Sequence, residues 1–113
     1  MFVKDQIIDH VGVITIQREE ALNAVNPEVL KELNSMLNKL ISDHDVGSII
    51  ITGAGEKAFI AGADIKFMQN FDKNEARDFG ELGQNLTLEI ENSPKPVIAA
   101  VNGFALGLSL IHI

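Results

Sequence analysis

Two turns rich in small residues are the parts of this sequence best suited to chemistry. The run Ala61-Gly62-Ala63-Asp64 carries little side-chain bulk, so a ligand can approach its main chain closely. If an N–H group from this turn and one from a second turn near Gly107 gripped the same oxygen, they would form an oxyanion hole, in which each donor lowers a barrier by roughly 3 to 4 kcal/mol. Small residues after a strand suit tight packing and turn geometry equally well, so both interpretations stay open.

Two short apolar segments must position these turns. Residues 48–52 and 97–101 are continuously apolar or nearly so, which predicts strands buried on both faces, as in parallel sheets. Each is followed along the chain by one of the small-residue turns. Because ligands bind beyond the carboxyl ends of the strands in open parallel sheets, both turns are placed where a ligand site is expected.

Two helices are predicted between the strands. Asn26 followed by Pro27 indicates an N-cap and a first helical residue, and apolar residues recur behind them at helical spacing as far as residue 41. Asp72 and Glu75 resemble a capping box at the start of a second amphipathic helix, which must end before Pro94. Residues 7–16 add a hairpin that turns at residues 9–10, so the whole pattern predicts one α/β unit without a domain boundary.

Composition excludes several classes of partner. The 113 residues are 46% apolar and 22% charged, a globular composition, and the net charge of -7 disfavours nucleic acid or an anionic membrane as the main partner. No apolar run approaches the roughly 20 residues of a membrane span. There is no cysteine, which fits a reducing compartment, and the histidines lack metal-ligand spacing. We therefore expect a soluble, cytoplasmic protein without a metal.

Three stretches of the chain, in order, resemble the signature stretches of the enoyl-CoA hydratase (crotonase) family. They are ALNA at residues 21–24, KAFIAGADIK at residues 57–66 and KPVIAAVNGFALG at residues 95–107. The resemblance covers most of residues 11–107 and involves the N-terminal part of the family's domain only. It implies an α/β fold in which ββα units form a spiral, here as a truncated N-terminal portion. Residues 1–107 would be part of one acyl-CoA-binding domain.

The resemblance also implies roles for the small-residue turns. The Ala63 N–H would donate to the thioester carbonyl of an acyl-CoA, and the segment lining the coenzyme A channel would include Ala61, Gly62, Asp64, Ile65 and Lys66. Gly107 would belong to the substrate site as well. No separate cofactor is expected, because coenzyme A is part of the substrate, and relatives in the family assemble as trimers or as hexamers made of two trimers.

The resemblance ends after Gly107. Leu108 stands at the family's second oxyanion donor, where a bulky side chain replaces glycine, and Ile111 stands where the first catalytic glutamate would fall. The second glutamate is not in the sequence. We expect residues 108–113 to be a non-native tail and the 113-residue chain by itself to be inactive and prone to aggregate.

Three functional hypotheses remain at this stage. The first is an enoyl-CoA hydratase, with other acyl-CoA reactions of the family such as double-bond isomerisation as variants, since the residues that distinguish them come mostly after position 107. The second is a non-catalytic acyl-CoA binding or assembly protein in which the missing carboxylates are genuine. The third is a small flavodoxin-like binding domain, which would show flavin absorbance and no affinity for coenzyme A. Acyl-chain length and pathway leave no trace in the sequence.

Overall fold

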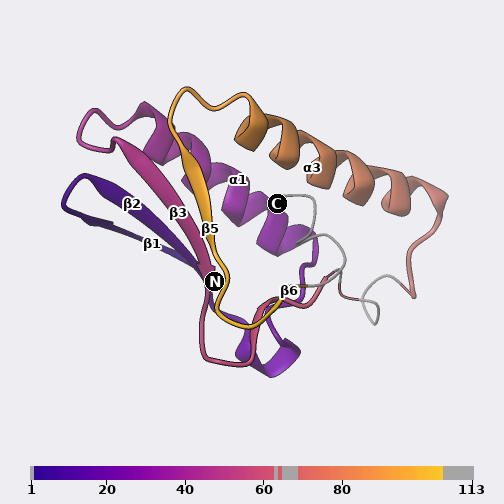
Figure 1. Cartoon of the computed structure of the whole chain (residues 1–113). Helices are drawn as coiled ribbons and strands as arrows, with labels where there is room; N and C mark the ends of the chain where they lie inside the picture. The colour runs from indigo at the N-terminus through magenta and orange to yellow at the C-terminus, as the bar shows by residue number, and fades with distance from the viewer. Residues whose placement is uncertain (1, 63, 65–68, 106–113) are drawn as a thin grey trace.

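A computed structural model of the chain describes residues 2–62, 64 and 69–105. Over these residues strands alternate with helices and form two sheets (Figure 1). The larger sheet contains, in spatial order, β1 (Val3–Ile8), β2 (Val11–Ile16), β3 (Ser48–Gly53) and β5 (Val97–Ala100). The smaller sheet pairs β4 (Ala58–Ile60) with β6 (Phe104–Ala105). The helical segments are the 3-10 helix η1 (Glu19–Ala21) and the α-helices α1 (Pro27–Ser42) and α3 (Lys73–Glu91).

The N-terminal hairpin is confirmed. β1 and β2 pair antiparallel, and they are joined by Asp9 and His10, both with positive φ, 48° and 68°. Positive φ at both central residues is the geometry of a type I′ turn, whose twist matches that of the strands it joins. β1 begins at Val3, earlier than the sequence pattern indicated, because Lys4, Asp5 and Gln6 interrupt the run of β-branched residues.

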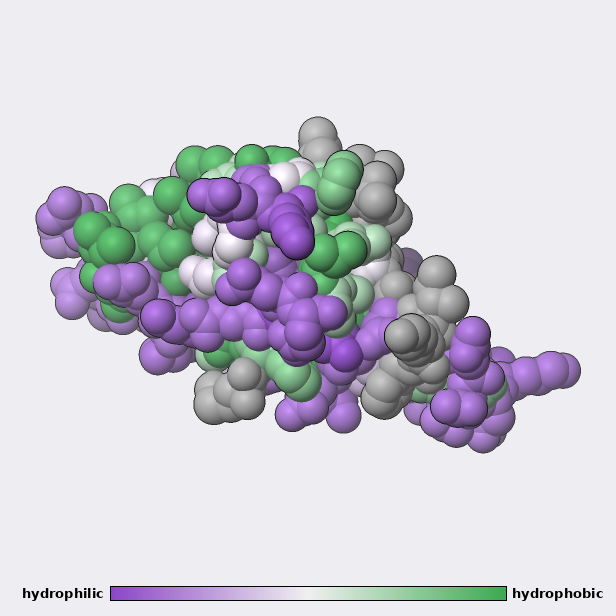
Figure 2. All heavy atoms as spheres, turned by 90° about the horizontal axis from the view of Figure 1, so that it is seen from below, coloured by the Kyte–Doolittle hydropathy of each residue, from purple (hydrophilic) through white to green (hydrophobic). Residues whose placement is uncertain are grey.

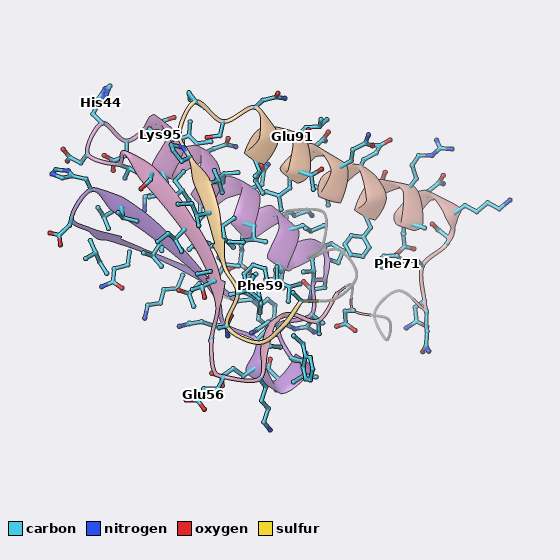
Figure 3. The ribbon with its side chains drawn as sticks, viewed as in Figure 1. His44, Glu56, Phe59, Phe71, Glu91 and Lys95 are labelled. Atoms are coloured by element: carbon cyan, nitrogen blue, oxygen red, sulfur yellow. The ribbon has the colours of Figure 1, made fainter. Side chains whose placement is uncertain are left out.

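Both predicted helices are present, with the predicted N-caps. The Asn26 side chain accepts a bond from Val29 N at 2.9 Å, and the Asp72 side chain accepts one from Glu75 N at 2.8 Å. At the other end of α1, Lys95 Nζ donates to two main-chain carbonyls in and just after its last turn, at 2.9 and 2.7 Å (Figure 3). The lysine adds a second bond to each of these carbonyls, which also accept from Asp43 N at 3.3 Å and from Val46 N at 3.1 Å.

The core lies between the larger sheet and the two α-helices, which pack against one face of the sheet and against each other (Figure 1). Strands β2 and β3 run parallel and contribute every second side chain to it. Full burial of each such aliphatic side chain contributes about 1.5 to 3 kcal/mol. The most deeply buried members of the core include Ile14, Ile16, Val29, Leu37, Leu40, Ile49 and Phe59.

The prediction that residues 48–52 and 97–101 form strands buried on both faces was wrong. In β3 buried and half-buried residues alternate, and in β5, an edge strand over the described residues, Ile98 is 52% exposed. The reason is that α1 and α3 cover only one face of the sheet, so its other face meets solvent. Figure 2 shows hydrophobic surface gathered on the side where the hairpin lies, and Ile7 and Ile8 of β1 are among the exposed apolar residues.

Candidate functional site

The loop between β3 and β4, residues 54–57, leads into the predicted ligand-binding turn and is held by Asn23. This side chain is 1% exposed, and its Nδ2 donates to Ala54 O at 3.1 Å and to Ala58 O at 2.9 Å. Its Oδ1 accepts a bond from Arg18 N at 2.9 Å. Asn23 has a φ of 58°, a left-handed conformation that asparagine adopts more readily than most residues. A single side chain therefore joins the segment after β2 to both ends of the loop.

Asn102, which follows β5, holds the same loop from the other side. Its Oδ1 accepts a bond from Gly53 N at 3.1 Å, and its Nδ2 donates to Gly55 O at 2.8 Å and Ala58 O at 3.1 Å. The Ala58 carbonyl thus accepts from two asparagines that are far apart in the sequence. Residue 103 must be glycine, because a Cβ there would overlap the main chain of Lys57.

The segment that starts the predicted site is bound to the chain after η1 by main-chain hydrogen bonds. Ala61 N donates to Leu22 O at 3.2 Å, Val25 N donates to Gly62 O at 2.8 Å, and Asp64 N donates to Val25 O at 2.8 Å. Gly62 has a φ of 108°, which side chains other than hydrogen rarely permit. Residues 61, 62 and 64 are therefore held against residues 22 and 25 by these three bonds.

Arg18 connects the same two segments through its side chain. Its Nη2 forms an ion pair with Asp64 Oδ2 at 2.7 Å, with each side chain 14% exposed, and its Nη1 donates to Ala24 O at 2.9 Å. The guanidinium carbon also lies 5.3 Å from the centre of the Phe2 ring, within cation–π range. Residue 65, which follows Asp64, lies outside the described residues.

Several predicted site residues cannot be placed. Ala63, Ile65, Lys66, Gly107 and Leu108 lie outside the described residues, as does the tail 108–113. The oxyanion hole therefore stays a prediction, and what the structure describes is its immediate surroundings.

An open hollow of about 580 Å³ lies between η1 and the loop from β3 to β4. Its walls carry three carboxylates, Glu19, Glu20 and Glu56, and one ammonium group, that of Lys57. Figure 3 shows Glu56 at the outer end of the loop. This balance of charge disfavours a phosphate group in the hollow. Among the described residues there is no group of three or more side chains suited to a metal ion.

Sequence reasoning overlooked Arg18 and gave Asn23 and Asn102 no role of their own. Asn23 and Asn102 could have been recognised as polar residues that each stand among small or apolar neighbours in the sequence. If such a side chain is buried, it must find hydrogen-bond partners, which predicts that it holds nearby main chain.

These features belong to a protein family with a defined fold. The sequence model of the enoyl-CoA hydratase/isomerase family matches residues 6–110, so the chain belongs to that family. The crystal structure of enoyl-CoA hydratase from Bacillus anthracis superposes with a TM-score of 0.92 at 34% identity, over 98% of this chain and 45% of that one. The enzyme from Thermoplasma volcanium gives a TM-score of 0.92 at 35% identity. The predicted fold class is confirmed.

Among characterised sequences the chain is similar to short-chain-enoyl-CoA hydratase of Clostridium acetobutylicum, with 50% identity over 97 residues, which is 86% of this chain and 37% of that protein. It is equally similar to crotonyl-CoA hydratase of Syntrophomonas wolfei, with 50% identity over 99 residues, 88% of this chain and 38% of that protein. The chain thus spans less than half the length of these relatives. No described helix is both long and apolar enough to cross a membrane.

Proposed function

We propose that this chain carries the N-terminal part of the acyl-CoA site of an enzyme that adds water to 2-enoyl-CoA thioesters. The observation that carries the proposal is the segment from Ala61 to Asp64, held by three main-chain hydrogen bonds around a glycine at φ 108°. This is the segment to which the family resemblance assigns the oxyanion donor. The similarity to short-chain-enoyl-CoA and crotonyl-CoA hydratases supports the same reaction.

In the mechanism proposed for the complete protein, the Ala63 N–H donates to the thioester carbonyl, and a second donor comes from the position at which Leu108 stands in this chain. The pair withdraws electron density from the conjugated double bond, so that water adds at the β-carbon with syn geometry through an enolate-like state stabilised by both N–H groups. Two carboxylates would orient the water and exchange protons with it. Neither is recognisable in this sequence, so we expect the chain to bind the thioester without hydrating it.

The remaining parts of the proposal concern the rest of the site and the assembly. Gly62, Asp64, Ile65 and Lys66 line the coenzyme A channel, with the main chain at Ala61 near the adenine, and Gly107 belongs to the substrate site. The main-chain bond from Ala61 N to Leu22 O supports this part of the proposal, because it holds residue 61 in place. Residues 1–107 form part of one domain, residues 108–113 are a non-native tail, and the complete protein is a cytoplasmic trimer or hexamer that needs no cofactor besides its substrate.

Titration of crotonyl-CoA into the chain, followed by amide NMR, tests the proposal. The expected result is saturable binding with the largest shifts at residues 61–66, and much weaker binding of crotonate, which lacks the coenzyme A part. Absence of shifts in this segment at saturating thioester would refute the proposal. Loss of the conjugated thioester absorbance during the titration would show that the chain is active and would contradict the expected inactivity.

A second candidate is a non-catalytic acyl-CoA binding protein, which is favoured by isoleucine at position 111, where the family has a glutamate. Thioester binding alone does not distinguish the two candidates, but the gene does. A reading frame that continues after codon 107 as Gly-Gly-x-Glu supports the hydratase, whereas a genuine stop supports the binding protein.

A further inference from the structure

The side chain of Arg18 lies at the junction of the two segments that form the described part of the site. Its two terminal nitrogens have different tasks, because Nη2 pairs with the Asp64 carboxylate and Nη1 donates to the Ala24 carbonyl. Its main-chain N–H donates to the side chain of Asn23. Arg18 is therefore bonded both to Asp64, which follows Gly62, and to residues 23 and 24, which lie beside the segment that Gly62 contacts.

The segment needs such a restraint because of Gly62. A glycine supplies the φ of 108° without strain, but it also allows more main-chain freedom than any other residue. On the two sides of position 63, the Gly62 carbonyl and the Asp64 N–H both bond to Val25, one as acceptor and one as donor. Both of these bonds run to Val25, whereas the Arg18–Asp64 pair connects residue 64 to a different part of the chain.

The chain contains a second ion pair that serves as a comparison. Lys39 Nζ lies 3.0 Å from Asp5 Oδ2, but the lysine side chain is 65% exposed, so solvent screens this pair. In the Arg18–Asp64 pair both side chains are 14% exposed and the contact is 2.7 Å, which makes it shorter and less screened. A planar guanidinium can also hold two acceptors in fixed directions, which an ammonium group cannot do.

We infer that Arg18 is a positioning residue for acyl-CoA binding, acting through Asp64 to fix the main chain on either side of position 63. This inference rests on the proposed function. Donors to an oxyanion must be held within about 0.5 Å of their working position. Because Gly62 next to position 63 allows the main chain many conformations, we expect the Arg18–Asp64 pair to be needed to hold that position.

The test compares the chain with its Arg18→Met and Arg18→Lys variants, using Lys39→Met as the matched loss of an exposed ion pair. Three quantities are measured: the affinity for crotonyl-CoA by calorimetry, the urea midpoint, and the hydrogen-exchange rate of the Asp64 amide against that of Leu37 in α1. We expect Arg18→Met to lower the affinity about tenfold or more. Arg18→Lys keeps the charge and should keep the urea midpoint, but it cannot contact the Asp64 carboxylate and the Ala24 carbonyl at the same time. Its affinity for crotonyl-CoA should therefore also fall. Amide exchange should accelerate at Asp64 and stay unchanged at Leu37.

Full affinity and full protection of the Asp64 amide in Arg18→Lys would overturn the inference. So would equal acceleration at Asp64 and Leu37, because that would show only a loss of global stability. If the unmodified chain fails to bind crotonyl-CoA, the proposed function fails, and the exchange rates still decide whether Arg18 positions the segment. The Lys39→Met variant should match the unmodified chain in affinity and in exchange at Asp64.

Discussion

Replacing Asn23 by alanine removes three hydrogen bonds from one buried side chain and is the substitution for which the structure predicts the largest local loss. The Arg18 N–H and the Ala54 carbonyl lose their bonds to this side chain, while the Ala58 carbonyl keeps its bond from Asn102. Each orphaned group costs about 1 to 3 kcal/mol, and alanine at a φ of 58° adds about 1 kcal/mol. Because Ala54 is half-buried and water can reach it in part, we expect a total of about 3 to 5 kcal/mol.

Urea unfolding followed by circular dichroism measures this loss. With a slope of roughly 1 to 3 kcal/mol per molar urea, the midpoint should fall by at least about 1 M. Asn23→Gly relieves the backbone strain but not the orphaned groups, so its midpoint should lie between those of the unmodified chain and Asn23→Ala. Asn38→Ala, at an exposed position of α1, is the control and should change the free energy of unfolding by less than about 0.7 kcal/mol. An Asn23→Ala midpoint equal to that of the control would refute the reasoning.

Three further predictions concern other contacts. Gly103→Ala places a methyl group against the main chain of Lys57 and should lower the free energy of unfolding by about 1 to 3 kcal/mol in the same urea experiment. An unchanged midpoint would show that the loop containing Lys57 can move to accommodate the methyl group without cost. Lys95→Met removes both bonds to the end of α1, so amide exchange in the last turn of that helix should accelerate while exchange in α3 stays constant. Ile98→Lys puts a charge on the exposed face of the edge strand and should reduce self-association in sedimentation experiments without lowering the urea midpoint, whereas unchanged association would exclude this face as its cause.

The elements that the sequence predicts well are those with local signals. The hairpin has a two-residue turn between β-branched runs, and both α-helices have an N-cap whose side chain bonds to a main-chain N–H three residues later. Each of these signals lies within a few residues of the structure it specifies, so it can be recognised without knowing the tertiary fold.

The elements that it predicts poorly depend on distant partners. Strands β4 and β6 are three and two residues long, and within the described part of the chain they pair with each other across more than forty residues. The bonds from Asn23 and Asn102 to Ala58 join residues 35 and 44 positions apart. The spacing of apolar residues along the sequence carries no information about such contacts. It also does not show which face of the sheet the helices will cover, and this decides which face is buried. In the stretches that resemble the family's signatures, Asn23, Lys95 and Asn102 each form hydrogen bonds that join distant segments of the fold.

The double anchoring of the Ala58 carbonyl also affects the order of events during synthesis. The hairpin, α1 and Asn23 emerge before the loop that they support, but the second anchor, Asn102, follows almost fifty residues after the loop begins. A growing chain can therefore bury much of its core while the loop from β3 to β4 still has one anchor. We expect this loop, and with it the segment proposed to bind thioesters, to be fixed in place late, after most of the secondary structure has formed.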